Sequence, residues 1–302
     1  MRLFALFAAA LLMASPASHA APSRSKSRAA PPSTSSGGAP SACLTSFPSP
    51  AALTTPVRDL TRVQARDIVI WLHKEGKIRL QQAPRFDASC RVTSPTPSGR
   101  VKLDITVDGV RYLYLSGRRT VAQPRIDNLD VRGAVLVARL AAQLKQDFGA
   151  TEIHHMGIGH GNAAHPLDCH NTGRAMDFGG AAGEKDGVPW RAHVVTDWSA
   201  KPVDAALRGT RANLYRAGAH PTYRLRSAGG VVPAVFESVY RFATQNAQDT
   251  TDRRGRNGTP TTIGASSKFI IHPDHPDTRL RSQHQDHIHF NIGPTGEERS
   301  PP

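Results

Sequence analysis

Residues 169–178 read Cys-His-Asn-Thr-Gly-Arg-Ala-Met-Asp-Phe, which places His170 seven residues before Asp177 with Gly173 between them. Far downstream, residues 286–290 read Asp-His-Ile-His-Phe. Two imidazoles and one carboxylate form a ligand set that binds Zn²⁺ and leaves a fourth position open for water. The two stretches together therefore predict a metal site, provided that the fold brings them side by side.

Local backbone preferences favour the same site. Residues two apart in a strand project to the same face, so His287 and His289 face one space if this stretch is extended. Gly173 permits a tight turn between His170 and Asp177. Taken singly, each stretch also has a structural interpretation, as histidines hydrogen-bonded within a sheet or as an aspartate paired with an arginine.

The motifs resemble those of a known enzyme family. The run from His170 to Asp177 is similar to the first zinc signature of the LAS-type metallopeptidases, Ser-x-His-x-x-Gly-x-Ala-x-Asp. This family includes D-alanyl-D-alanine carboxypeptidases and murein endopeptidases. His287-Ile-His289 resembles the second signature, His-x-His, and His284 resembles a further histidine of the penicillin-insensitive murein endopeptidases. The resemblance covers residues 125–293.

The resemblance implies a role for each matching residue. His287 would be the catalytic base, because a neutral imidazole accepts and returns protons near pH 7. His284 would lie near the metal or beside its ligands. Arg174, which the resemblance does not assign, is expected either on the surface or beside the ligands. The ligands of the one Zn²⁺ ion would be His170, Asp177 and His289.

The implied function is that of an exported zinc-dependent peptidase that hydrolyses peptide bonds in peptidoglycan stems or cross-links. The chain departs from the family pattern, since Asp168 occupies the serine position and Cys169 precedes His170. The family often has an arginine on the preceding strand that binds a substrate carboxylate, but residues 153–160 contain no arginine. We therefore favour an endopeptidase over a carboxypeptidase.

The N-terminal composition predicts export. Residues 1–20 have the pattern of a signal peptide, with Arg2, an apolar run and small residues up to Ala20. The apolar run is too short for a permanent membrane anchor, so we expect a periplasmic or extracellular protein. Residues 21–50 are rich in Pro, Ser, Ala and Gly, which is typical of a disordered linker.

The chain is strongly basic, with a formal net charge of +14. Such a charge favours attraction to anionic cell-envelope polymers, although a general contribution to solubility explains it equally well. We expect peptidoglycan or another peptide as substrate, and no specific nucleic-acid partner.

Hydrophobic patterning predicts an α+β fold in which a small antiparallel sheet, flanked by helices, carries the zinc site. A helix and a hairpin are expected to precede this sheet in an N-terminal segment, residues 51–122. The helix covers residues 58–76, and the hairpin joins residues 101–107 to 110–114 through Asp108-Gly109.

The metallopeptidase-like domain is expected over residues 123–296, followed by a tail, residues 297–302. Residues 179–232 have no clear periodicity and contain several glycines, prolines and arginines. Periodicity elsewhere predicts helices over 131–148, closed by Gly149, and from Pro233 to Ala243, and strands over 152–158, 268–272 and 286–292.

The chain has three cysteines, of which two can form a disulfide in an oxidising compartment. All three pairings are open, and we favour Cys43 with Cys90 because it would tie the linker to the first folded segment. Cys169 adjoins His170, but neighbours in an extended backbone point to opposite sides, which argues against its binding the same metal.

Two other functions compete with the peptidase. A ββα-metal nuclease would suit a basic exported chain with Asp286-His287, but that fold needs a further histidine after this pair on a helix, and no histidine follows His289. The stronger alternative is a non-catalytic cell-wall-binding protein on a metallopeptidase scaffold, since the expected substrate-binding arginine is missing.

Overall fold

We describe a computed structural model of the chain, covering residues 43, 48–116, 119–123, 126–159, 169–199, 224–225, 230–246, 270–273, 280 and 283–292. These residues belong to one compact unit, Ala39–Pro302. The signal peptide, most of the linker and the C-terminal tail expected from the sequence lie outside the described residues. Among the helices described, none has the length and apolar character needed to cross a membrane.

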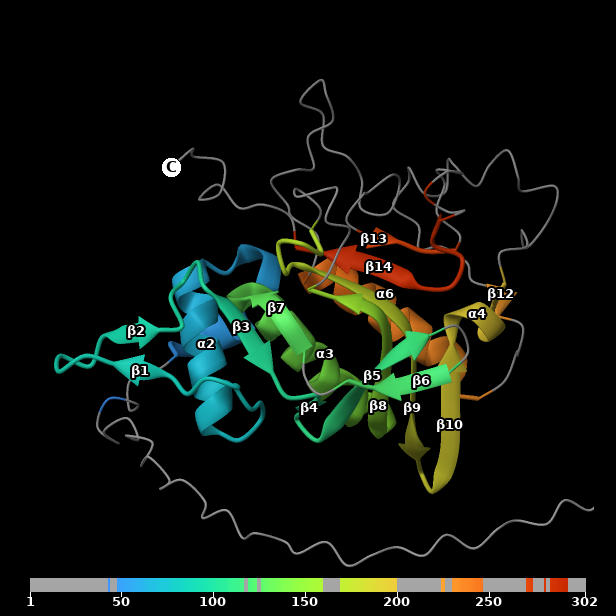
Figure 1. The fold of residues 1–302 in the computed structure, drawn as a ribbon. Helices are drawn as coiled ribbons and strands as arrows, with labels where there is room; N and C mark the ends of the chain where they lie inside the picture. Colours follow the sequence, from blue (N-terminus) through green and yellow to red (C-terminus); the bar gives the residue numbers. More distant parts are fainter. Residues whose placement is uncertain are drawn as a thin grey trace, which may run out of the picture. The chain divides into compact units, whose positions relative to one another are not determined.

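The described chain is a mixed α/β structure, compatible with the α+β class (Figure 1). Its main sheet has eight strands, larger than the small sheet that patterning predicts. The strand order is β13 (Ile270–Ile271), β14 (Ile288–Asn291), β9 (Ala175–Lys185), β8 (Ala150–Ile158), β5 (Val110–Ser116) and β4 (Thr106–Val107), with β10 (Val188–His193) paired to β9 and β6 (Arg119–Ala122) paired to β5.

The sheet is not wholly antiparallel, which corrects the sequence prediction. β5 pairs with β8 in parallel, with Tyr112 opposite Ile153. Parallel neighbours need a long crossover connection, and here it contains helix α3 (Val131–Phe148), which leads directly into β8. The main sheet therefore includes strands from residues 51–122 and from residues 123–296, which hydrophobic patterning predicts as two separate segments.

The expected hairpin before the main sheet is shorter than predicted. The turn at Asp108-Gly109 joins only β4 to β5, whereas β3 (Arg100–Leu103) pairs with β7 (Ile126–Asp130) in a separate sheet. Two further two-stranded sheets are formed by β1 (Arg85–Phe86) with β2 (Val92–Ser94), and by β11 (Trp198–Ser199) with β12 (Arg224–Leu225).

α3 is the central helix of the core, and its predicted bounds are confirmed. The Asp130 side chain caps its N-terminus by accepting the Arg132 N–H, and Gly149 ends it with a left-handed φ of 64°. Most of its residues are buried, and it contacts α2 (Arg62–Lys74), α6 (Val232–Asn246) and β8. Three short helices also lie in the described part of the chain: α1 (Pro50–Thr54), η2 (Val57–Asp59) and α4 (Val194–Asp197).

The region 179–232, which has no clear periodicity, contains most of β9 and all of β10. The small residues of β9 give no alternation of apolar and polar side chains, so the sequence does not predict this strand. They are needed for close packing, because a Cβ on Gly180 would lie 2.2 Å from the carbonyl oxygen of Ala192 on β10. The turn between the strands is Asp186-Gly187, both with positive φ, 55° and 77°. This is the same Asp-Gly hairpin signal as at residues 108–109, so the hairpin was recognisable.

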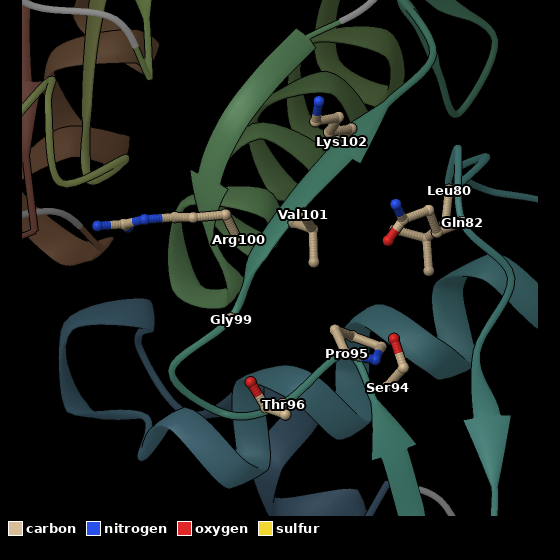
Figure 2. Close-up of a pocket in the computed structure, with 9 residues that line it drawn as sticks. All are labelled: Leu80, Gln82, Ser94, Pro95, Thr96, Gly99, Arg100, Val101 and Lys102. Atoms are coloured by element: carbon tan, nitrogen blue, oxygen red, sulfur yellow. The ribbon is translucent and has the colours of Figure 1, made fainter.

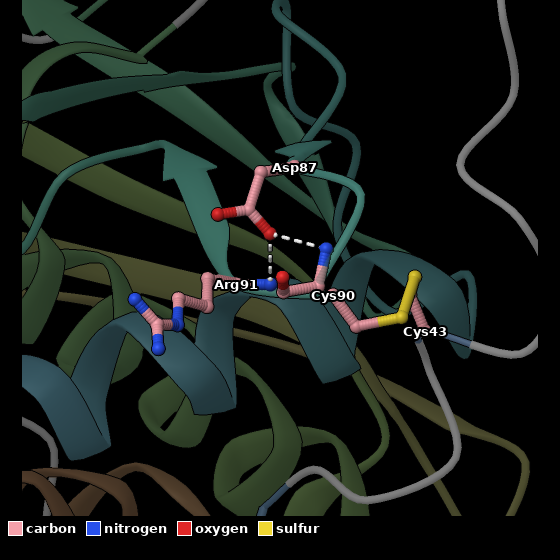
Figure 3. Close-up of a disulfide and its surroundings, with 5 residues drawn as sticks. Cys43, Asp87, Cys90 and Arg91 are labelled. Atoms are coloured by element: carbon pink, nitrogen blue, oxygen red, sulfur yellow. Dashed lines mark hydrogen bonds between the residues drawn. A yellow bond between two sulfur atoms is a disulfide. The ribbon is translucent and has the colours of Figure 1, made fainter.

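The structure confirms the favoured disulfide, Cys43–Cys90, whose Cα atoms lie 4.9 Å apart. Cys90 lies in a turn where the Asp87 carboxylate accepts the Arg91 N–H at 2.9 Å (Figure 3). Cys169 does not take part in this disulfide.

Candidate metal centre

Adjacent strands bring the two sequence motifs together, although 112 residues separate Asp177 from His289. On β9, Asp177 lies directly opposite His289 of β14, and on the other side it lies opposite Gly157 of β8. His170 belongs to the tight turn that precedes β9. The antiparallel register of β14 against β9 therefore determines which histidine meets the aspartate.

Three side chains converge with their potential ligand atoms within 4.8 Å of one another: His170, Asp177 and His289. Asp177 Oδ1 lies 2.7 Å from His289 Nδ1 and 3.2 Å from His170 Nε2. The two histidine nitrogens lie 3.2 Å apart. Both histidines are buried and the aspartate is half-buried, so this group could hold a metal ion.

The geometry of the group fits a small tetrahedral ion. With metal–ligand bonds of about 2.0–2.1 Å, ligand atoms at tetrahedral angles lie about 3.3 Å apart. The observed separations of 2.7 and 3.2 Å are close to that spacing and need only a small expansion. Gly157 leaves room beside the group, because a Cβ there would lie 3.1 Å from Asp177 Oδ2 and 3.5 Å from His170 Cε1.

The aspartate is held in its ionised form. Burial by itself raises the pKa of Asp177, but hydrogen bonds from His170 and His289 and the charges of His289 and His287 outweigh burial. The pKa of Asp177 therefore lies well below its ordinary value. A carboxylate that stays ionised is ready to bind a cation without first losing a proton.

His287 lies beside the group and has an acidic partner of its own. Its Nδ1 lies 2.7 Å from Asp286 Oδ1, and its Nε2 lies 3.4 Å from Asp177 Oδ1. The hydrogen bond to His287 is the main reason why the pKa of Asp286 is lowered. When Nδ1–H donates to Asp286, Nε2 carries the lone pair and can accept a proton. Sequence reasoning missed this role of Asp286, although a carboxylate next to a candidate base was a visible signal.

His284 lies close to the candidate ligands, as the motif resemblance implies. The His284 ring centroid is 4.8 Å from that of His287 and 5.5 Å from that of His289. His284 Nδ1 lies 2.7 Å from the Leu280 carbonyl oxygen, and burial lowers the pKa of His284 to about 4, so its ring is neutral at pH 7. Arg174 is buried and its Nε donates to Thr172 Oγ1 at 3.0 Å.

The metal turn, which we define as Cys169–Arg174, has hydrogen bonds to every one of its backbone carbonyls. Within the turn, the Arg174 N–H donates to the Cys169 carbonyl and the Gly173 N–H to that of His170. Side chains outside the turn donate to two more carbonyls: Asn128 Nδ2 to that of Asn171 and Arg100 Nη1 to that of Thr172. The backbone N–H groups of Asp130 and Ile292 donate to the carbonyls of Gly173 and Arg174, respectively. Sequence reasoning missed Arg100 and Asn128, because no motif contains them.

Asn291 is a further partner that sequence reasoning missed. Its side-chain Nδ2 lies 3.0 Å from His289 Nε2, so in the metal-free chain the amide donates to Nε2 while Nδ1–H donates to Asp177. If His289 bound a metal through Nδ1, Nε2 would carry the proton and the amide oxygen of Asn291 would have to accept it, as the second nitrogen of a histidine ligand commonly requires. Asn291 is two residues after His289 and therefore on the same face of β14.

A cavity of about 250 Å³ lies away from these residues, next to β3. Its lining includes Leu80, Ser94 and Val101, and none of the candidate ligands is among its lining residues. Figure 2 shows that the side chain of Arg100 points away from the other lining residues. This is the arginine that donates to the metal turn.

Buried neutral histidines predict that acid destabilises the metal-free protein. Burial lowers the pKa of His155 to about 4, and its Nδ1 has no hydrogen-bond partner among the described residues. Because the unfolded state binds a proton near pH 6.5 and the folded state does not, stability falls as the pH drops from about 6.5 to about 4. His155 alone contributes up to about 3 kcal/mol to this loss.

Denaturant unfolding of the metal-free protein between pH 7 and pH 4 measures this effect. His155→Phe, which keeps a ring beside Tyr112 and Tyr114, is expected to flatten the pH dependence. An unchanged slope in the variant would show that His155 is not the group responsible.

Comparison with known proteins finds no family model, no curated protein and no solved structure that matches this chain.

Proposed function

We propose that the chain is an exported zinc-dependent peptidase that hydrolyses peptide bonds in peptidoglycan stems or cross-links. The observation that carries the proposal is the convergence of His170, Asp177 and His289, with His287 beside them. Two imidazoles and a carboxylate that leave one position free are the donor set of catalytic zinc sites. The resemblance of both motifs to the LAS-type signatures supports the same activity.

Each residue has a defined task in this proposal. His170 Nε2, His289 Nδ1 and Asp177 would hold Zn²⁺, which supplies a Lewis acid for the carbonyl group and makes water more acidic. His287 accepts a proton from the attacking water at Nε2 and later returns it to the leaving amine. Asp286 orients the His287 ring and stabilises its protonated form through the 2.7 Å hydrogen bond to Nδ1.

Cleavage inside the peptide is favoured over removal of a terminal residue. A carboxypeptidase needs a cation that binds the free carboxylate of its substrate, and β8 has no arginine in this chain. The signal-peptide pattern and the net charge of +14 support a substrate in the anionic cell envelope.

Digestion of purified peptidoglycan by the zinc-loaded mature protein tests the proposal. We expect soluble muropeptides in which cross-linked dimers are converted to monomers, with no general release of terminal alanine. Treatment with a chelator is expected to abolish the products, and added Zn²⁺ to restore them. Unchanged peptidoglycan in the presence of a zinc-loaded protein would refute the substrate, and sedimentation of that protein with the polymer would favour the non-catalytic wall-binding alternative.

A further inference from the structure

Asn128, which belongs to neither motif, connects the end of β8 to the turn that contains His170. Its side-chain Nδ2 donates to the Gly159 carbonyl at 2.7 Å and to the Asn171 carbonyl at 3.2 Å. Gly159 directly follows β8, and Asn171 directly follows His170. An asparagine NH₂ group has two donor hydrogens, so one side chain can serve both carbonyls.

The backbone of Asn128 also lies against the metal turn. Asn128 has a φ of 56°, a left-handed conformation that asparagine tolerates better than most residues. A Cβ on Gly173 would lie 2.1 Å from the Asn128 carbonyl oxygen, and the Asp130 N–H donates to the Gly173 carbonyl at 3.0 Å. The strand β7 and the metal turn are therefore in direct contact from Asn128 to Asp130.

These contacts determine where His170 lies relative to β8. The hydrogen bond from Gly173 N–H to the His170 carbonyl closes the turn locally, but it does not fix the distance between the turn and β8. The Asn128 side chain spans that distance, since its amide reaches the end of β8 and the residue after His170. His170 Nε2 must stay within 3.2 Å of Asp177 Oδ1 on β9, the strand next to β8.

We propose that Asn128 is a positioning residue of the metal centre, which holds His170 in its ligand position before the ion binds. The inference rests on the proposed function of this site as a zinc centre. Residues that orient metal ligands through hydrogen bonds typically contribute 10- to 100-fold to metal affinity. A residue with a purely structural role would instead change the stability of the metal-free fold and leave the affinity of the folded protein unaltered.

Asn128→Gly removes the amide while keeping a residue that adopts positive φ without strain. Asp186→Gly is the matched control, because Asp186 has a φ of 55° in the exposed turn between β9 and β10. Asn128→Asp is a second variant, which keeps the size and backbone preference of Asn128 but directs a carboxylate oxygen at two carbonyl oxygens.

Zinc affinity is measured by competition with a chromophoric chelator, together with denaturant unfolding of each metal-free protein. We expect affinity to fall about 10- to 100-fold in both Asn128 variants and to stay within about twofold in Asp186→Gly. The visible absorption spectrum of bound Co²⁺, which reports ligand geometry, is expected to change in the Asn128 variants alone.

Two different failures can be told apart because wild type is measured in the same series. Wild-type affinity and an unaltered Co²⁺ spectrum in folded Asn128→Gly and Asn128→Asp would overturn the positioning role alone. Absence of zinc binding by wild type would overturn the proposed metal centre, and the positioning role with it.

Discussion

Replacing His289 with alanine is expected to abolish stoichiometric zinc binding and, with it, all peptidoglycan hydrolysis. His289 Nδ1 lies 2.7 Å from Asp177 Oδ1 and 3.2 Å from His170 Nε2, so its loss removes one corner of the ligand group. Because several ligands share a large binding free energy, we expect zinc affinity to fall by at least about a hundredfold. Metal analysis after gel filtration and chelator competition measure this loss.

The fold is expected to survive His289→Ala, since β14 is also held by its backbone pairing to β9 and β13. His73→Ala is a matched control on α2, where the histidine contacts the Ile78 carbonyl rather than the candidate ligands. The control is expected to retain both zinc and activity. Wild-type zinc affinity in folded His289→Ala would show that His289 is not a ligand.

The second large effect is expected for replacement of His287, which should reduce catalysis without reducing metal binding. His287→Ala removes the group that accepts a proton at Nε2, but it leaves His170, Asp177 and His289 in place. General acid–base groups typically contribute 10²- to 10⁴-fold, so we expect kcat to fall by about that factor while zinc content stays at the wild-type value. Muropeptide release and metal content, measured on the same preparation, test this separation.

Asp286→Asn refines the same test. The amide keeps a hydrogen-bond partner for His287 Nδ1 but removes the negative charge that stabilises a protonated ring. We expect a smaller loss of kcat than in His287→Ala, again with zinc retained. If His287→Ala lost its zinc in parallel with its activity, His287 would be a ligand rather than the base.

Strongly periodic elements could be predicted from the sequence, because their patterns reflect local physics. The helix Val131–Phe148 has an apolar face, an aspartate cap and a terminal glycine, and all three features lie within the element itself. The strands β9 and the parallel pair β5–β8 depend on contacts between distant segments. Gly180 is favourable in β9 only because Ala192 of β10 approaches it closely, and no local pattern contains that information.

The residues of the candidate site likewise divide into those that the sequence predicts and those that depend on contacts between distant segments. His170 and Asp177 belong to one short motif and His287 and His289 to another, and the resemblance of the two motifs together to the zinc signatures singled them out. Asn128 acts through its side chain on a carbonyl 43 residues away, a contact that leaves no spacing pattern in the sequence. Arg100 likewise reaches a carbonyl 72 residues away.

The measurement that tests the central claim most directly is the zinc content of the wild-type protein, purified without metal-binding tags in zinc-containing buffer. The proposed metal centre predicts one tightly bound Zn²⁺ per chain, retained through gel filtration and lost in His289→Ala. A folded wild-type protein that emerges free of zinc after the same treatment would contradict it.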